Sequence, residues 1–216
     1  MDLNTEIDFA ITTYCQAKCR SCQRTNQETG EQEDWLTPTH MSYTVFDNLL
    51  NGIPHDLYTA QFCGELGDPM MHPEITKFVD RIFAHPNVRR LVINTNGGLR
   101  SPSWYTMMGE KYGNKLQICF GIDGMSHDTN WKYREGVDWQ RAIDNMMAYK
   151  SAGGGTVWHF IIFDWNWYEV YMAYDFSIKH DIELILKYNY RDYGLISDKN
   201  KIECNKVLAR ILENEN

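Results

Sequence analysis

Apolar positions along the chain follow two alternating spacings. Short runs of apolar and β-branched residues, which are typical of buried strands, alternate with longer segments in which apolar residues recur every three to four positions, as on one face of a helix. The pattern predicts six strands, over residues 7–13, 58–63, 90–95, 116–122, 156–163 and 183–188. Helices are predicted between them, from Ser42 onward and over residues 74–84, 103–112, 139–152 and 168–180.

This alternation of strand and helix, without hairpin signals, predicts a parallel sheet with helical crossovers. Six strands rather than the eight of a closed barrel predict a partial (β/α)6 TIM-like barrel in a single α/β domain. We expect residues 1–188 to form its core and residues 189–216 to add a C-terminal loop and a helix with apolar positions Val207, Leu208, Ile211 and Leu212. Functional side chains are expected at the carboxyl ends of the strands.

Composition adds limits on the class of protein. The chain has 216 residues, of which 43% are hydrophobic, and a formal net charge of −8. An acidic surface repels phosphate backbones and anionic lipids, so a nucleic-acid partner is disfavoured and no membrane partner is expected. No apolar run approaches the length of a membrane span, and we expect a cytoplasmic location.

Three of the six cysteines, Cys15, Cys19 and Cys22, lie within eight residues, directly after the first predicted strand. So tight a group is more typical of a metal or iron-sulfur site than of a disulfide framework. Three thiolates at this spacing can hold three corners of a 4Fe-4S cluster and leave one iron open to a small molecule. A zinc site completed by Cys63 or a histidine is the alternative.

Residues 14–22, YCQAKCRSC, match the C-x3-C-x2-C signature of the radical S-adenosylmethionine (SAM) superfamily. The chain resembles that family. The resemblance implies an oxygen-sensitive enzyme with one 4Fe-4S cluster on Cys15, Cys19 and Cys22, which cleaves SAM reductively to a 5'-deoxyadenosyl radical. It also implies a reductase partner such as flavodoxin or ferredoxin.

A second similarity follows the second predicted strand, where residues 62–73 read FCGELGDPMMHP. This segment resembles the glycine-rich loop with which the family approaches the amino group of SAM. Gly67, Asp68 and Pro69 align best, which implies that they bind the cofactor. The family's usual glutamate is replaced by the shorter Asp68, so its polar contact is either displaced or made by Glu65.

The fourth strand leads into residues 121–136, which resemble the S-x-D-G, H-D and R-G motifs of the peptide-modifying branch of the family. The resemblance implies that Asp123 and Arg134 lie near SAM, with Arg134 as the partner of its carboxylate, because a guanidinium pairs well with that group. Gly121 stands where relatives commonly carry a serine that contacts SAM.

Two further strand ends resemble the family. NTNG, after the third strand, implies that Asn94 and Asn96 line the SAM cavity, and the fifth strand with its following loop implies that Ile161 and Asn166 lie near the adenine. Histidines and tryptophans in this region, such as His159, are expected to pack rather than to catalyse.

The resemblance is strongest to the catalytic domain of the peptide-modifying branch, the SPASM and anaerobic sulfatase-maturase-like proteins. Only Cys204 lies in the C-terminal region, where such relatives hold auxiliary clusters, so one cluster is expected. The branch implies that the substrate is a peptide or protein side chain. Two alternatives remain, an activase of a glycyl-radical enzyme and, because of Asp68 and Gly121, a non-catalytic metal-binding or regulatory protein on the same fold.

Overall fold

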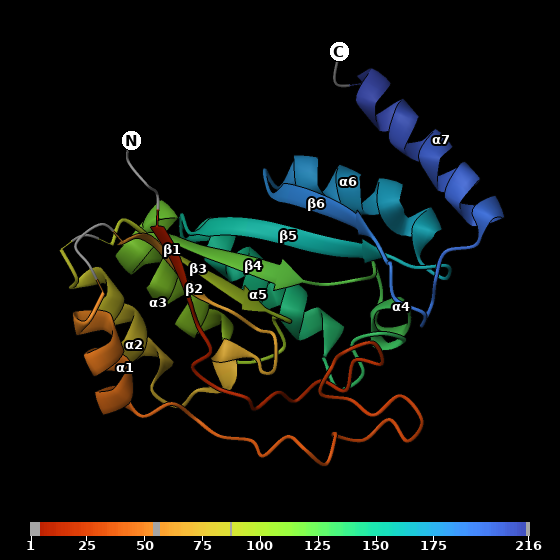
Figure 1. Ribbon diagram of the computed structural model, residues 1–216. Coiled ribbons are helices and arrows are strands. Elements are labelled where there is room, and N and C mark those ends of the chain that lie inside the picture. The colour runs from red at the N-terminus through yellow and green to blue at the C-terminus, as the bar shows by residue number, and fades with distance from the viewer. Residues whose placement is uncertain (1–4, 54–56, 87, 215–216) are drawn as a thin grey trace.

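The strands form one parallel sheet whose spatial order follows the sequence. The computed structural model describes residues 5–53, 57–86 and 88–214. The strands are β1 (Thr5–Phe9), β2 (Leu57–Phe62), β3 (Arg90–Thr95), β4 (Leu116–Gly121), β5 (Gly155–Ile162) and β6 (Glu183–Tyr188). Each pairs in parallel with the next, and β1 and β6 form the two edges of the sheet (Figure 1). The predicted partial barrel of six strands is therefore confirmed.

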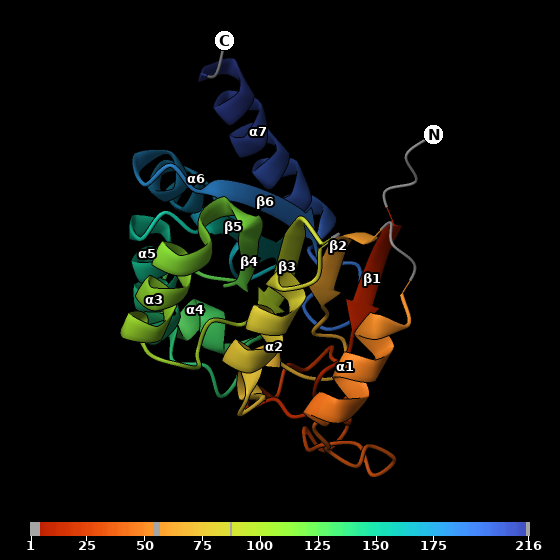
Figure 2. The same cartoon turned by 90° about the vertical axis from the view of Figure 1, so that its left-hand side faces the viewer.

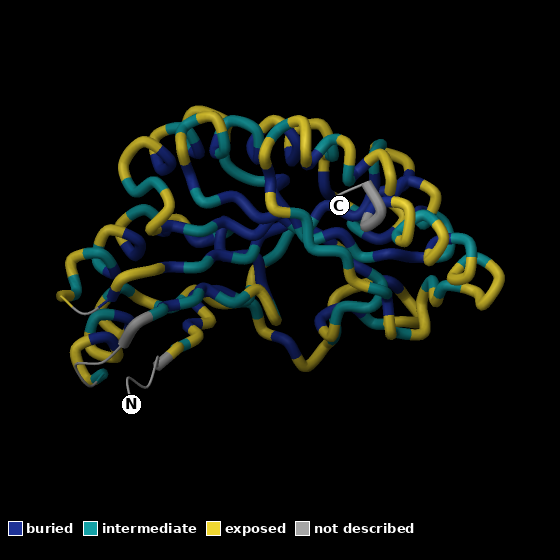
Figure 3. The backbone as a smooth tube through the Cα atoms, turned by 90° about the horizontal axis from the view of Figure 1, so that it is seen from above, coloured by how far each residue is buried: buried dark blue, intermediate teal, exposed yellow. Residues whose placement is uncertain are grey.

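Helices cover the outer, convex face of the curved sheet, so that they form an arc around the strands when the molecule is seen from above (Figure 3). They are α1 (Tyr43–Asn51), α2 (Ile75–Phe83), α3 (Pro102–Tyr112), α5 (Trp139–Ser151) and α6 (Val170–Lys179). Helix α7 (Asp198–Asn214) packs against α6 and extends beyond β6 (Figure 2). No helix among the described residues is both long and apolar enough to cross a membrane.

Polar caps determine where several helices begin. The side chains of Ser42, Ser101 and Asp138 accept hydrogen bonds from the backbone N–H groups three residues later, at the starts of α1, α3 and α5. Such caps satisfy donors that have no partner within the helix. The short helix α4 (His127–Trp131) and the 3-10 turns η1 (Pro69–Met71), η2 (Gly113–Lys115) and η3 (Trp167–Glu169) were not predicted.

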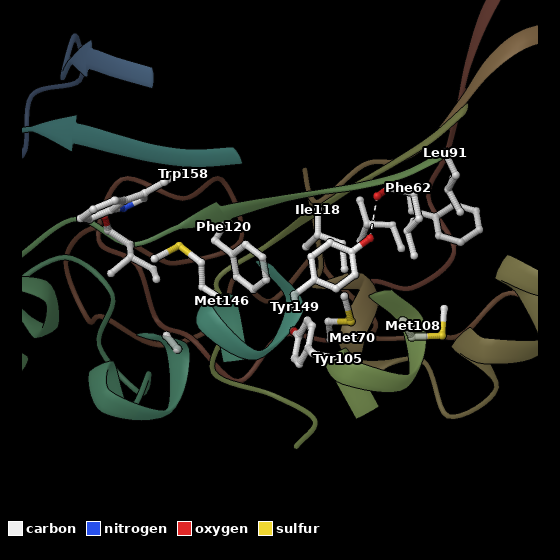
Figure 4. Packing of buried hydrophobic residues seen from close by; sticks show 14 of the residues in the cluster. Phe62, Met70, Leu91, Tyr105, Met108, Ile118, Phe120, Met146, Tyr149 and Trp158 are labelled. Atoms are coloured by element: carbon white, nitrogen blue, oxygen red, sulfur yellow. Dashed lines mark hydrogen bonds between the residues drawn. The ribbon is translucent and has the colours of Figure 1, made fainter. Parts of the chain in front are cut away.

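The main core lies between the sheet and the outer helices (Figure 4). Phe120 and Trp158 project from the strands and are fully buried, each of them worth roughly 1.5–3 kcal/mol of burial free energy. Tyr149 of α5 donates from its hydroxyl to the carbonyl of Leu116 at 2.6 Å. Since successive residues of a strand face opposite sides, the intervening positions point to the concave face, where the polar residues gather.

The largest difference from a predicted strand boundary is at the end of β1. Strand β1 ends at Phe9 and not at residue 13, because the chain leaves the sheet to pair with a later segment. Thr12 forms an antiparallel bridge with His40, and Thr13 N–H donates to the carbonyl of Thr39 at 2.9 Å. The cysteine loop therefore starts from this added pairing.

In α7, Ile211 is buried and Val207 and Leu208 are half-buried, as the pattern predicts, while the Leu212 side chain lies outside the described residues.

Candidate functional site

A pocket of about 200 Å³ opens at the carboxyl ends of the strands. Of the twelve predicted site residues, nine line this pocket: Cys15, Cys19, Cys22, Gly67, Asp68, Asn94, Asn96, Arg134 and Ile161. Pro69, Asp123 and Asn166 do not line it and lie behind its wall. Another cavity, at the opposite ends of β4, β5 and β6, contains no part of these motifs. The sequence motifs thus converge on one end of the barrel.

The cysteine loop brings three thiols to one side of this pocket. Cys19 is buried, whereas Cys15 and Cys22 are half-buried, and a turn in which Cys22 N–H donates to the Cys19 carbonyl at 2.9 Å joins two of them. Burial raises the pKa of Cys15 to about 12, an effect that Asp68 reinforces, and it raises the pKa of Cys19. Without a metal the Cys15 and Cys19 thiols are neutral, and a bound iron would displace their protons.

In the described ranges of the chain, the thiols do not form the ligand set of a single zinc ion. Among the described residues, no three His, Cys, Asp or Glu side chains converge on one point as the ligands of one metal ion must. Cys63, the proposed fourth zinc ligand, is half-buried and does not line the pocket. Three thiols from one loop can instead hold separate irons of a larger cluster.

Arg24 ties the cysteine loop to the glycine-rich loop. Its guanidinium is buried and donates to the carbonyls of Thr13 and Leu66, each at 2.8 Å. These bonds use a charged donor to fix two loops that are far apart in sequence. These bonds fix the position of the cysteine loop relative to the glycine-rich loop.

The glycine-rich loop passes so close to the cysteine loop that a side chain at Gly67 is excluded. A Cβ at this position would stand 2.3 Å from the carbonyl oxygen of Thr12. Asp68 follows, and its N–H donates to the carbonyl of Tyr14 at 2.8 Å. The glycine is therefore needed for contact between two segments of the chain itself.

The Asp68 carboxylate forms hydrogen bonds within the protein. Glu65, the alternative polar contact in this loop, is exposed. Asp68 accepts hydrogen bonds from Met70 N–H and Thr95 Oγ1 at 2.9 Å and from Asn96 N–H at 2.8 Å. Burial raises the pKa of this carboxyl, against the lowering effect of these bonds. Asp68 thus caps η1, whose first residue is the buried Pro69, and fixes the end of β3.

Asn96 connects the end of β3 with the first cysteine. Its Nδ2 lies 3.7 Å from Cys15 Sγ, and its Oδ1 accepts from Gln16 Nε2 at 2.7 Å. Gln16 was not predicted as a site residue, and the sequence carries no signal for this contact across 80 positions. Asn94 lies two residues earlier on the same strand face and lines the pocket.

A buried ion pair supports the far side of the cysteine loop. Arg134 Nε donates to Asp123 Oδ2 at 2.7 Å, and Arg134 Nη1 lies 3.9 Å from Cys19 Sγ. Burial by itself would lower the pKa of Arg134, but Asp123 and then Cys19 raise it well above its ordinary value. The guanidinium faces the pocket with its charge held in place, while the fully buried Asp123 lies behind it.

Asn166 stabilises the loop after β5 instead of lining the pocket. Its side chain accepts from Phe163 N–H at 2.7 Å and donates to the carbonyls of Asp123 and Ile161, each at 2.9 Å. The buried Glu169, which the sequence reading missed, accepts from Met125 N–H at 3.0 Å. These bonds join the ends of β4 and β5.

The sequence reading also missed part of the pocket wall. Thr95, Cys119, His159 and Lys187 line it together with Ala17, Arg24, Gly64 and Gly121. His159 was expected to pack, but it faces the pocket. The signal available was the two-residue alternation along each strand, which places Cys119 with Gly121 and His159 with Ile161.

The model of the Radical SAM superfamily matches residues 9–170. No curated protein matches the chain.

Several solved structures share its fold. SuiB of Streptococcus suis bound to the precursor peptide SuiA is 15% identical, with a TM-score of 0.74, over 100% of this chain and 47% of that one. Native anSMEcpe with bound AdoMet is 15% identical, with a TM-score of 0.72, over 97% and 61%. Methylornithine synthase (PylB) is 12% identical, with a TM-score of 0.58, over 93% and 61%. The chain spans about half to three fifths of the length of these proteins.

Proposed function

Because the chain belongs to the radical SAM superfamily, we propose that it holds one 4Fe-4S cluster on Cys15, Cys19 and Cys22 and is an enzyme that cleaves SAM. When bound, the reduced cluster supplies the electron that splits SAM into methionine and a 5'-deoxyadenosyl radical, which removes a hydrogen atom from substrate. A reductase such as flavodoxin or ferredoxin is the proposed source of that electron.

One observation carries this proposal: six residues predicted from separate motifs line the same pocket as the three thiols. These residues come from the cysteine loop, the glycine-rich loop and the ends of β3, β4 and β5. A chance match in one short segment of sequence would not explain their convergence on one pocket. In the proposed site, Arg134 binds the carboxylate of SAM, and Asn94, Asn96 and Ile161 line its cavity. Asp68, Asp123 and Asn166 hold these groups in position through the bonds described above.

A peptide or protein side chain is the proposed substrate. SuiB was solved with the precursor peptide SuiA, and anSMEcpe was solved with AdoMet and the Cp18Cys peptide. The pocket of the present chain lies on the concave side of a sheet whose edge strands do not pair with each other among the described residues. Such an open side gives an extended chain a route to the site. Residues 1–188 are proposed as the catalytic core.

The deciding experiment is anaerobic reconstitution with iron and sulfide, followed by reduction and addition of SAM. We expect about four irons per chain and formation of 5'-deoxyadenosine. The triple variant Cys15→Ala, Cys19→Ala, Cys22→Ala should lose both. Cys63→Ala is the matched control, because Cys63 is half-buried but does not line the pocket.

Stoichiometric zinc in place of iron, or deoxyadenosine formation that survives the triple substitution, would refute the proposal. Peptide modification is tested separately by adding peptide mixtures to the working enzyme. Deoxyadenosine formation that responds only to small metabolites and never to a peptide would leave SAM cleavage standing and remove the peptide substrate.

A further inference from the structure

One wall of the pocket includes two residues, His159 and Lys187, that none of the assigned motifs explains. His159 and Ile161 of β5 and Lys187 of β6 form this wall, which we call the β5–β6 wall. The register of the sheet pairs Ile161 with Lys187, and His159 lies two residues before Ile161 on the same face. These side chains therefore form one continuous patch, built from different strands than the cysteine loop.

Lys187 brings a positive charge to the pocket. None of the ion pairs among the described residues involves it. The two arginines that line the pocket are engaged, Arg134 by Asp123 and Arg24 by backbone carbonyls.

Asp68 is the one acidic residue lining the pocket, as far as the described chain shows, and its carboxylate already accepts three donors. Within the part of the chain that the structure describes, the pocket thus has a cation without an ion-pair partner and no free anion, in a protein whose net charge is −8. A cation placed in this way attracts an anionic group of a ligand.

The neighbouring histidine adds hydrogen-bonding capacity without charge. Burial, and then the nearby Lys187 and Arg134, lower the pKa of His159 to about 4, so its ring is neutral at neutral pH. A neutral imidazole offers one donor and one acceptor nitrogen. The β5–β6 wall therefore complements a single negative charge. A carboxylate carries one such charge, whereas a phosphate monoester carries roughly −1.5 to −2.

We propose that the substrate is a peptide with an acidic residue, whose carboxylate is bound by Lys187 with His159 hydrogen-bonded beside it. This inference rests on the proposed function, because the β5–β6 wall belongs to the pocket in which SAM is cleaved. Anchored at β6, the acidic residue presents its neighbouring carbons toward the thiol side of the pocket. Lys187 is accordingly a substrate-specificity residue, distinct from the residues proposed to hold SAM.

The test compares two tripeptides, acetyl-Ala-Glu-Ala-amide and acetyl-Ala-Gln-Ala-amide, for binding to the reconstituted holoenzyme with SAM by titration calorimetry. They differ in one charge and have the same shape. We expect the glutamate peptide to bind about threefold tighter, which lies within the range for one ion pair at a solvent-accessible site. Lys187→Met should abolish the preference. Lys199→Met, which removes an exposed lysine on α7, should keep it.

A charge reversal gives a gain of binding that a misfolded protein would not show. Lys187→Glu should prefer acetyl-Ala-Lys-Ala-amide over the glutamate peptide. Equal binding of the glutamate and glutamine peptides by the parent protein, no binding of either, or a preference that survives Lys187→Met would overturn the inference.

Deoxyadenosine formation in the same preparations separates this inference from the function on which it rests. Lys187-dependent binding of the glutamate peptide without SAM cleavage would leave the acidic-peptide site standing and refute the proposed function. SAM cleavage without a preference for the glutamate peptide would leave the proposed function standing and refute the acidic-peptide site.

Discussion

The guanidinium of Arg134 occupies space that exists because residue 121 is a glycine: a Cβ at Gly121 would stand 2.7 Å from Arg134 Nη2. The same guanidinium binds Asp123 and extends to Cys19 Sγ. Relatives that the sequence resembles commonly carry a serine at this position. In this chain the absence of that side chain and the presence of the guanidinium go together, so Gly121 is not by itself a sign of lost SAM binding.

Gly121→Ser should displace Arg134. The added atoms overlap the guanidinium, so we expect unfolding free energy to fall by about 1–3 kcal/mol, as in other overpacked sites. Loss of a charged hydrogen-bond donor should weaken SAM binding about tenfold or more. Urea unfolding and equilibrium dialysis with SAM measure the two effects. Gly52→Ala is the control, since its Cβ would make ordinary contacts at 3.5 Å. Unchanged SAM affinity in Gly121→Ser would show that Arg134 does not bind SAM.

Gly67→Ala should be more damaging, because its Cβ would overlap the backbone carbonyl of Thr12 at 2.3 Å and a backbone atom cannot move aside as a side chain can. We expect a loss of about 3 kcal/mol or more in unfolding free energy and lower iron retention after reconstitution. Gly64→Ala in the same loop is a graded comparison, since its nearest contact would be 3.1 Å. Equal effects of the two substitutions would contradict the close approach of the glycine-rich loop to the Thr12 carbonyl at Gly67.

The fold could be predicted because its signals are local. Strands β3 and β6 begin and end where the apolar pattern predicts, and each motif follows a strand. The role of Asp68 could not be predicted, since its partners Thr95 and Asn96 lie 27 and 28 positions away and their bonds depend on how β2 and β3 align. Lys187 was missed because an exposed lysine acquires meaning only when β6 is placed beside β5.

His159 should make stability depend on pH in a defined direction. Its folded-state pKa of about 4 lies below the ordinary value of 6.5, so the unfolded state binds more protons between these values. The stabilising contribution of the neutral ring is therefore fully present above about pH 6.5 and is lost as pH falls toward 4. Urea unfolding of the metal-free protein at pH 7.5 and pH 5 should show a smaller loss of stability in His159→Gln than in the parent. An NMR titration that places the His159 pKa near 6.5 would contradict this account.

The Asp123–Arg134 pair should be strongly coupled, because each charge is desolvated and the other compensates it. Asp123→Asn keeps the shape of the side chain but leaves the guanidinium without its counter-charge. The NH2 group that replaces one oxygen must face either Arg134 Nε or Ile161 N–H, and it cannot accept from either of them. We expect a loss of about 3–5 kcal/mol in unfolding free energy. Arg134→Met alone should also destabilise the protein, since it leaves a buried carboxylate unpaired.

Combining the two substitutions distinguishes this coupling from two independent packing defects. Once Asp123 is neutral, removing the guanidinium takes away an uncompensated charge, so the double variant should be more stable than the sum of the single losses by about 0.5–3 kcal/mol. Chemical denaturation of the four metal-free proteins gives the cycle without any contribution from a bound cluster. Additive losses would mean that the 2.7 Å contact contributes little, and that Arg134 is positioned mainly by its packing against Gly121. A large coupling would establish that the buried carboxylate holds the guanidinium where it faces Cys19 and the pocket.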